Sequence, residues 1–224
     1  MAEQRSFKIA VLGGTGAQGS ALALRLARAG HMVTIGSRDA ERARVAAGEL
    51  GARAARAIAG ADNRAAATAA QIVLLTVPYA AQRETIEDVV AQLQGKILVD
   101  ATVPLLPPKV SVVQLPQAQS AVAAIQQMLG NGVRVVSAFQ NVAAQHLADL
   151  DHAVDCDVLV CGDDAAACDL VIGLCADIGL RGLHAGGIRN SAAAEALTSL
   201  LIAINRRYKV RGGAGIRITG IPNR

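Results

Sequence analysis

Three glycines at fixed spacing form the first stretch of this chain that could do chemistry. Gly14, Gly16 and Gly19 give the pattern G-x-G-x-x-G between an apolar run at residues 7–12 and a helical pattern at residues 17–29. In that setting Gly14 allows a tight turn, Gly16 lets the backbone approach a pyrophosphate, and Gly19 lets the helix pack closely on the strand. The helix N-terminus offers free N–H groups and a partial positive charge to phosphates. We therefore expect a dinucleotide to bind at this turn.

The end of the second apolar run indicates which dinucleotide binds. Ser37 and Arg38 follow residues 32–36, and Arg42 lies one helical turn later. An acid at this point would accept from the ribose hydroxyls of NAD and repel a 2′-phosphate, whereas a serine and two guanidinium groups can hold that phosphate. Hydrogen bonds to a charged group contribute about 1.5–3 kcal/mol each, so we expect NADP to bind roughly a hundredfold more tightly than NAD. Asp39 does not oppose this, because it can cap the following helix.

Two further strands end in the same tripeptide, Thr-Val-Pro, at residues 76–78 and 102–104. Ligands of open α/β sheets bind at the carboxyl ends of the strands, where the strand order reverses. A proline there would hold the backbone rigid beside a flat ring. The alternative is that each proline only ends its strand.

Cysteine and histidine residues show no pattern typical of a metal or redox site. The four cysteines form no CxxC pair and have no histidine at ligand spacing, so we expect buried thiols and no metal. They are Cys156, Cys161, Cys168 and Cys175. The four histidines, which we expect to be structural or exposed, are His31, His146, His152 and His184.

The elements that must position these residues alternate between strand and helix. The predicted strands are residues 7–12, 32–36, 56–59, 71–78, 96–102 and 133–139. The predicted helices are residues 17–29, 39–50, 61–70, 80–93 and 118–129. Such alternation predicts a Rossmann-like α/β fold with a doubly wound parallel sheet.

The remainder of the chain predicts a small C-terminal α/β extension. Its elements are a strand at 157–162, a helix at 164–178, an edge strand at 179–185, a helix at 190–208 and a glycine-rich tail at 211–220. The last helix carries Leu197, Leu200, Leu201 and Ile204 on one stripe. We expect a boundary near residues 145–152, which divides the chain into a dinucleotide-binding domain at 1–148 and a smaller domain at 149–224.

Composition excludes several other classes of protein. Of the 224 residues, 52% are apolar, which supplies a full core. Only 2% are aromatic, which argues against a site built on an aromatic cage or on aromatic side chains that stack on bases. The net charge of +4 comes without a nucleic-acid reader motif, so we expect no nucleic-acid partner. We find neither a signal peptide nor an uninterrupted apolar run of about 18 residues. We therefore expect a cytoplasmic protein without a membrane partner.

Several motifs together resemble a known family, the NADPH-dependent reductases of the deazaflavin coenzyme F420. They are GGTGAQG, GSR with Arg42, TVP, VP, SAFQNV, CDVLVCGDD and NRRYKVRGGAGIRITG. The similarity extends from about residue 7 to residue 220. It implies that NADP is the cofactor, that F420 is the co-substrate, and that a hydride passes reversibly between them. The resemblance also implies a homodimer.

The same resemblance implies which residues contact each ligand. Those for NADP are Gly14, Thr15, Gly16, Ala17, Gln18, Gly19, Ser37, Arg38, Arg42, Thr76, Val77, Val103, Ala144 and Ala214. Those for F420 are Val103, Pro104, Gln140 and Thr198. The segment 138–144 and the C-terminal domain would complete the deazaflavin pocket.

Hydride transfer between two rings needs no obligate acid, base or nucleophile, so we expect stacking to carry catalysis. Gln140 and Asn141 are candidates to donate a hydrogen bond to the deazaflavin, although some relatives carry histidine where this chain has Gln140; ordinary loop hydrogen bonding is the alternative for both. Two other functions stay open. One is an NADPH-dependent reductase of a flavin, quinone or ferric chelate, and the other is a non-catalytic protein that senses NADP.

Overall fold

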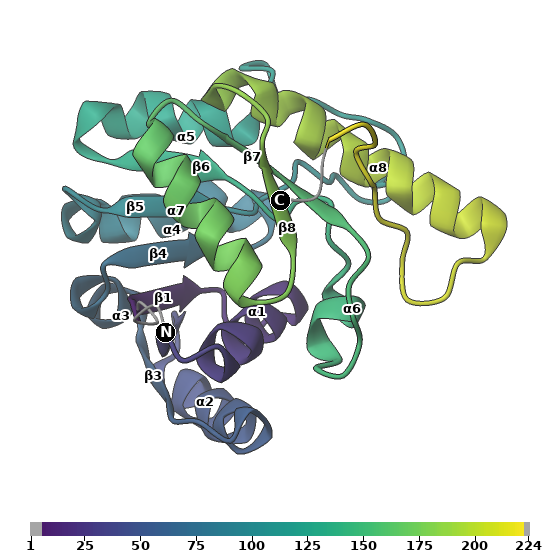
Figure 1. Ribbon diagram of the computed structural model, residues 1–224. Coiled ribbons are helices and arrows are strands. Elements are labelled where there is room, and N and C mark those ends of the chain that lie inside the picture. Colours follow the sequence, from purple (N-terminus) through teal and green to yellow (C-terminus); the bar gives the residue numbers. More distant parts are fainter. Residues whose placement is uncertain (1–5, 222–224) are drawn as a thin grey trace.

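The computed structural model describes residues 6–221, which form one eight-stranded sheet with helices on both faces (Figure 1). The strand order is β3-β2-β1-β4-β5-β6-β7-β8. The strands are β1 (Lys8–Leu12), β2 (Met32–Ser37), β3 (Ile58–Asp62), β4 (Ile72–Leu75), β5 (Ile97–Asp100), β6 (Arg134–Ser137), β7 (Asp157–Gly162) and β8 (Arg181–His184). This is the Rossmann-like α/β fold that the alternating pattern predicts.

Helices follow most strands, as the sequence predicts. They are α1 (Ala17–Arg28), α2 (Ala40–Ala54), α3 (Asn63–Ala69), α4 (Tyr79–Leu93), α5 (Ala121–Leu129), α6 (Ala144–Ala148), α7 (Ala165–Asp177) and α8 (Ser191–Tyr208), with two short 3-10 turns at Gly130–Gly132 and Ile188–Asn190. The sequence pattern did not predict α6, and the predicted end of α2 at residue 50 lies four residues before its observed end at Ala54. No helix among residues 6–221 is long and apolar enough to cross a bilayer.

Alternate residues of the buried strands supply two hydrophobic cores, one on each face of the sheet. In β1, Ile9 and Val11 pack with α1, α2 and α7, while Ala10 and Leu12 pack with α3, α4 and α5. Because residues 9–12 of β1 are buried on both faces of the sheet, this part of the strand is a continuous apolar run in the sequence. Because β1, β2, β4, β5 and β6 run parallel, their carboxyl ends lie together at one edge of the sheet.

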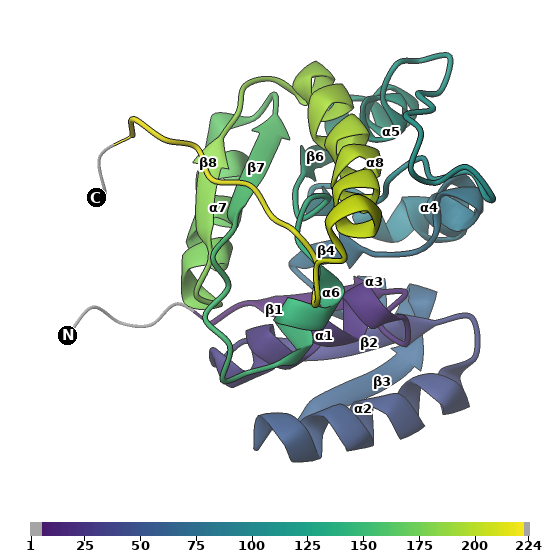
Figure 2. The same cartoon turned by 90° about the vertical axis from the view of Figure 1, so that its right-hand side faces the viewer.

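Beyond those carboxyl ends lie α6, α8 and the C-terminal tail, which Figure 2 shows together with the start of α1. The strands β1 to β6 are parallel, but β7 runs antiparallel to β6 and β8 runs parallel to β7. The predicted parallel sheet is confirmed for β1 to β6, and the strands of the C-terminal extension join its edge, with β7 antiparallel to β6. The chain between β6 and β7 contains only the short helix α6, so β7 starts at the end of the sheet where β6 finishes.

A buried arginine fixes the segment between β6 and β7. Arg25 of α1 donates to the carbonyl oxygens of Leu147 at 2.7 Å, Asp149 at 2.6 Å, His152 at 3.0 Å and His146 at 3.1 Å. These bonds satisfy carbonyls that no secondary structure would otherwise pair. The boundary expected at residues 145–152 thus lies in a segment held against α1. The sheet continues across it, and the division into two domains stays a prediction.

Two predictions about side chains have different outcomes. All four cysteines are buried, as expected, and burial raises the pKa of Cys161 and Cys168 to about 11. The expected stripe on α8 is divided, because Leu201 is 6% exposed whereas Leu200 is 51% and Ile204 is 40% exposed. The exposed side of α8 is therefore partly apolar.

Candidate functional site

The glycine turn between β1 and α1 owes its shape to packing on three sides. Gly13 has φ +83°, a conformation that favours glycine, and Gly14 follows it in the same turn, which the N–H of Gly16 closes by donating to the Gly13 carbonyl at 2.9 Å. A Cβ on Gly14 would lie 2.7 Å from Ile35 of β2. A Cβ on Gly19 would lie 2.6 Å from the Gly13 carbonyl oxygen and would also clash with Thr76. Gly19 therefore brings helix and strand together as predicted.

The N-terminus of α1 is open to a ligand. Gly16 is exposed and occupies the N-cap position, with no side chain to cap the helix and no acid in the first turn. The first N–H groups of a helix have no partner within the helix, so the N–H groups after Gly16 face the solvent side of the turn. This is the arrangement in which helix termini bind phosphate groups.

The segment after β2 carries two unpaired cations. Asp39 accepts hydrogen bonds from the N–H groups of Glu41 at 2.9 Å and Arg42 at 3.1 Å, so it caps α2 as predicted. Its carboxylate is therefore engaged with the helix. Among residues 6–221, no hydrogen bond or ion pair engages the guanidinium of Arg38 or Arg42, and both side chains are exposed. Ser37, Arg38 and Arg42 thus present donors for an anion.

A cavity of about 590 Å³ opens beside this segment. Its lining residues come from the ends of β2 and β3 and from α4: Ser37, Arg38, Asp62, Asn63, Arg64, Glu84, Thr85, Glu87 and Asp88. Asn63 is 5% exposed, and within the described chain its Oδ1 atom has no hydrogen-bond partner. A volume of this size suits a small-molecule ligand. Arg42 does not line the cavity.

Sequence reasoning missed Asn63 because it ended β3 three residues too early. The sequence predicts a helix at residues 61–70, which places both Asp62 and Asn63 in its first turn. In the structure Asp62 ends β3 and caps α3 by accepting from Ala65 N at 2.8 Å, and Asn63 begins the helix. The available signal was a pair of polar residues directly after a strand, at the edge of the sheet where ligands bind.

The first Thr-Val-Pro segment lies against the glycine turn. Thr76 donates through its hydroxyl to the carbonyl of Leu12 at 2.9 Å, which fixes the end of β4 to the end of β1. The backbone nitrogen of Val77 would lie 3.0 Å from a Cβ on Gly13. Thr76 and Val77 are therefore adjacent to the candidate dinucleotide loop, as the sequence predicts.

A fully buried carboxyl group fixes the second Thr-Val-Pro segment. Asp100 ends β5 and accepts from Gln82 Nε2 at 2.7 Å and from the N–H of Thr102 at 2.8 Å. Burial raises the pKa of Asp100, and the hydrogen bonds from Thr102 and Gln82 oppose that rise. Val103 is half-buried and Pro104 is buried in the chain that follows.

The loop after β6 connects this edge to the glycine turn. Phe139 has φ +73°, which is uncommon for a non-glycine residue and marks a constrained loop. Its carbonyl accepts from Gln18 Nε2 at 3.2 Å. Gln140 donates to the Asp100 carbonyl at 2.8 Å and to Ser137 Oγ at 2.9 Å.

These contacts change the role expected of the two amide side chains. Asn141 donates to the Asp157 carbonyl at 2.6 Å, so the amide nitrogens of both Gln140 and Asn141 are engaged within the protein. The Oε1 atom of Gln140 and the Oδ1 atom of Asn141, both acceptors, have no hydrogen-bond partner within the described residues. The arrangement therefore argues against a donor role and agrees with loop hydrogen bonding. Whether either residue contacts a ligand stays a prediction.

The remaining predicted site residues come from α6, α8 and the tail. Thr198 of α8 donates to the Gln140 carbonyl at 2.8 Å, which joins α8 to the loop. The N–H of Ala214 donates to Asn205 Oδ1 at 2.7 Å, and Ala214 lines a separate cavity of about 210 Å³. Ala144 begins α6 beside that cavity. The predicted residues thus occupy neighbouring positions along one edge of the sheet and do not share one cavity.

These features fit a bound dinucleotide. The open N-terminus of α1, the glycines with no space for a Cβ, and the unpaired Arg38 would hold its phosphates. Asn63 lines the adjoining cavity, and its unpartnered Oδ1 is an acceptor that the adenosine part would satisfy. The loop after β6 would lie near the opposite end of the ligand.

Comparisons with known proteins show which family the chain resembles. Residues 8–104 match the family model described as NADP oxidoreductase, coenzyme F420-dependent. The chain is 44% identical over 223 residues to the F420-dependent NADP reductase of Methanothermobacter marburgensis, with 96% of this chain and 99% of that protein aligned. It is 43% identical to the enzyme of the same name from Methanocaldococcus jannaschii, with coverages of 96% and 99%.

A solved structure extends the similarity to three dimensions. A crystal structure from Arthrobacter sp. FB24, provisionally described as an F420-dependent NADP reductase, superposes with a TM-score of 0.77 at 28% identity. The superposition covers 92% of this chain and 97% of that one. Both the fold and the sequence therefore agree over nearly the whole length. The chain belongs to the family of F420-dependent NADP reductases.

Proposed function

We propose that this chain exchanges a hydride between NADP(H) and coenzyme F420 at the carboxyl edge of its sheet. The observation that carries the proposal is the open N-terminus of α1 beside the unpaired guanidinium of Arg38, with the nearby acid Asp39 already engaged in capping α2. Together these groups suit a pyrophosphate and a 2′-phosphate. The names of the relatives supply the identity of the second substrate.

The chain contributes position more than chemistry. When bound, NADPH supplies a hydride to a ring carbon of the deazaflavin, a proton from water completes the reduction, and NADP⁺ remains. The glycine turn and Arg38 would fix the phosphates, and Val77, Val103 and Pro104 would support the rings. Holding two reactants in a productive geometry can lower a barrier by about 7–11 kcal/mol.

Asn63 would recognise the adenosine part of NADP. Its Oδ1 atom is buried and lacks a partner within residues 6–221, and it would lie 3.0 Å from a Cβ on Gly36. Asn63 is thus held against the end of β2, directly before Ser37 and Arg38. An exocyclic amine or a ribose hydroxyl could donate to this oxygen, which would otherwise remain buried and unsatisfied.

We also propose that the protein is a homodimer in which α8 forms part of the interface. Leu200 is 51%, Ile204 is 40% and Tyr208 is 73% exposed on this helix. Arg206 of α8 donates to Ser111 Oγ at 3.0 Å, which brings the loop carrying the exposed Val112 alongside. Contiguous exposed apolar surface is typical of protein–protein contacts. Light scattering of the wild type and of a Leu200→Glu variant would test this, with a monomeric wild type contradicting it.

The C-terminal domain at residues 149–224 would then complete the deazaflavin pocket through α8 and the tail. We place the enzyme in the cytoplasm, because its expected cofactor, NADP(H), forms a cytoplasmic pool.

The function itself is tested by mixing the protein with NADPH and oxidised F420 and following the visible absorbance of F420. Loss of that absorbance, with NADPH consumed in equal amount, is the expected result. Consumption of NADPH only with a flavin, quinone or ferric chelate would favour a different acceptor. Tight NADPH binding without turnover of any acceptor would favour a sensing protein instead.

A further inference from the structure

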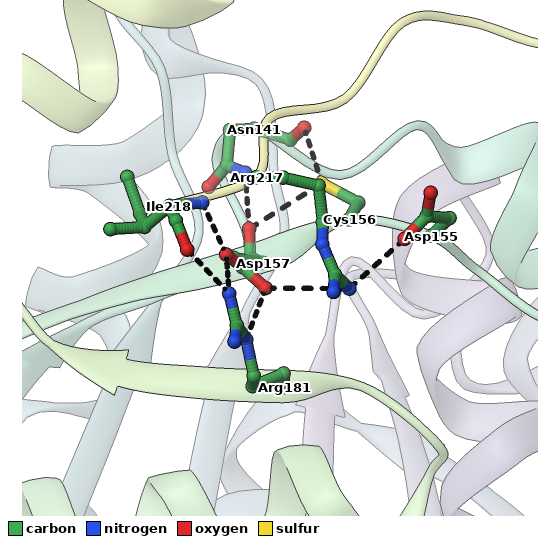
Figure 3. Close-up of polar contacts among 7 residues, drawn as sticks. All are labelled: Asn141, Asp155, Cys156, Asp157, Arg181, Arg217 and Ile218. Atoms are coloured by element: carbon green, nitrogen blue, oxygen red, sulfur yellow. Dashed lines mark hydrogen bonds and ion pairs between the residues drawn. The ribbon is translucent and has the colours of Figure 1, made fainter. Parts of the chain in front are cut away.

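The second residue of the segment CDVLVCGDD, residues 156–164, is Asp157, whose carboxylate the hydride transfer itself does not use. The side chain of Asp157 is fully buried, and Arg181 of β8 donates to its two oxygens at 2.7 and 2.6 Å (Figure 3). The N–H of Ile218 in the C-terminal tail donates to the same carboxylate at 2.6 Å. Asp157 therefore joins two strands of the sheet to the tail.

The tail lies along a part of β7 that β6 leaves unpaired. Within the described residues, β7 pairs with β6 only at Cys161 and Gly162, near the C-terminal end of β7. The N-terminal part of that same edge of β7 is therefore not paired with β6. The Asp157 N–H donates to the Ile216 carbonyl at 2.8 Å, and Arg181 donates to the Ile218 carbonyl at 2.8 Å. The backbone N–H of Asp157 thus holds the tail at Ile216, and its carboxylate holds the tail at Ile218.

Close packing shows that the tail fits this position specifically. A Cβ on Gly215 would lie 2.7 Å from the Cys156 sulfur, so only glycine allows this approach without a shift. Nearer to the site, the Gly213 carbonyl lies 2.9 Å from His146 Nε2, and a Cβ on Gly213 would lie 2.6 Å from Ala143. The tail is therefore packed against the loop after β6.

Asp157 also holds that loop from the other side. Its carbonyl accepts from Asn141 Nδ2 at 2.6 Å, and the thiol of Cys156 donates to the same carbonyl at 3.4 Å (Figure 3). The neighbouring Gln140 accepts from Thr198 of α8 through its carbonyl. One residue thus connects the tail, the loop and, through the loop, α8.

We infer that Asp157 is a positioning residue, which with Arg181 holds the tail and the loop after β6 as two walls of the site for the deazaflavin ring. The inference rests on the proposed function, because only that function places a second ring at this edge. The hydrogen bonds from Arg181 hold the pKa of Asp157 below its ordinary value, which keeps the carboxylate ionised at neutral pH. A merely structural pair would join β7 to β8 without reaching the tail.

Two variants loosen the tail by different routes. Arg181→Ala removes the double hydrogen bond, and Arg181→Lys is the conservative change that keeps one charge. Because Arg181→Ala removes both guanidinium hydrogen bonds from a buried carboxylate, it risks unfolding the chain. Gly215→Ala avoids that risk by pushing the tail away from Cys156. Thr219→Ala is the matched control, since Thr219 lies on the same tail and its side chain is exposed.

We expect Arg181→Ala and Gly215→Ala to raise the KM for F420 about tenfold, while the Kd for NADPH changes less than about twofold. Arg181→Lys should fall between these variants and the wild type, and Thr219→Ala should resemble the wild type. Hydrogen exchange followed by mass spectrometry should show faster exchange in residues 213–218 and in the loop after β6 for the two disruptive variants.

Two results would overturn the inference. One is faster exchange of the tail with an unchanged KM for F420, and the other is an equal loss of affinity for both ligands. A wild-type protein that does not reduce F420 would overturn the proposed function instead. The exchange measurement does not depend on activity, so it would still show whether Asp157 holds the tail.

Discussion

Glu195 of α8 lies 2.7 Å from the hydroxyl of Ser120, and its second oxygen accepts from the N–H of Ala121 at 2.8 Å. Ser120 is the N-cap of α5, so a carboxylate from one helix occupies the N-terminus of another. The contact is buried, with Glu195 only 1% exposed. It anchors the helix that carries Thr198 to the dinucleotide-binding half of the chain.

The burial of Glu195 predicts a pH dependence of stability. Desolvation raises the pKa of Glu195 above its ordinary value of 4.5, although hydrogen bonds from Ala121 and Ser120 oppose the rise. A raised value in the folded state means that the contribution to stability is complete below about pH 4.5 and is lost as the pH rises through the folded value. We expect the free energy of unfolding of wild type relative to Glu195→Gln to decrease over that interval.

Urea unfolding at a series of pH values would measure this difference. Glu87→Gln is the control, because Glu87 is exposed and, within the described part of the chain, forms its ion pair with Arg83 on the same helix. Its difference from wild type should not vary appreciably over the same interval. A difference between wild type and Glu195→Gln that does not depend on pH would contradict the prediction.

Arg38 should determine the choice between the two pyridine nucleotides. Arg38→Ala removes a charged donor, so we expect NADPH to bind about tenfold or more weakly and NADH to bind almost as before. Steady-state kinetics with each nucleotide would show this. Arg44→Ala is the control, because Arg44 lies on α2 and pairs with Glu41 at 2.6 Å. Equal weakening of both nucleotides by Arg38→Ala would contradict the phosphate role.

Opposite effects are expected for two glycine-to-alanine changes, one at the glycine turn and one in α2. Gly19→Ala would place a Cβ against the Gly13 carbonyl and Thr76, so we expect a lower melting temperature and weaker NADPH binding. Gly48→Ala meets nothing within 4 Å in the middle of α2 and should stabilise by up to about 1 kcal/mol, because alanine favours helix. Unchanged stability and binding in Gly19→Ala would show that the packing at the turn does not matter.

Asn63 should affect the adenosine half of the cofactor alone. We expect Asn63→Ala to weaken the binding of adenosine 2′,5′-bisphosphate roughly fivefold or more, because a hydrogen bond to a buried acceptor is lost, and to leave F420 binding unchanged. Isothermal titration calorimetry with each ligand would measure both effects. Thr68→Ala, on the exposed side of α3, is the control for a change in the same helix. Unaltered binding of the bisphosphate would remove Asn63 from the site.

The sequence predicted the parts of the fold that local patterns determine. The apolar run of β1 and the glycines after it specify a strand, a turn and a helix, and Asp39 behaves as the cap that its position indicates. The motif begins at Gly14, so the pattern did not indicate that the residue before it, Gly13, takes the positive φ of the turn.

Long-range contacts account for what the sequence did not predict. The direction of β7 depends on where the chain returns to the sheet, which no local pattern records. An arginine within a helical pattern is usually exposed, but Arg25 is buried and donates to carbonyl groups more than 120 residues later in the sequence. The glycine-rich tail shows no strand pattern, and its place depends on Asp157 and Arg181. Motif similarity singled out these segments without explaining them.

The transfer of deuterium tests the central claim most directly. NADPH that carries deuterium at its transferable position is mixed with oxidised F420 and the wild-type enzyme in ordinary water, and the products are analysed by mass spectrometry. If the two rings lie in contact along this edge, the deuterium should appear in reduced F420 in a one-to-one ratio. Deuterium that is lost to water, or that never reaches F420, would contradict direct transfer between stacked rings.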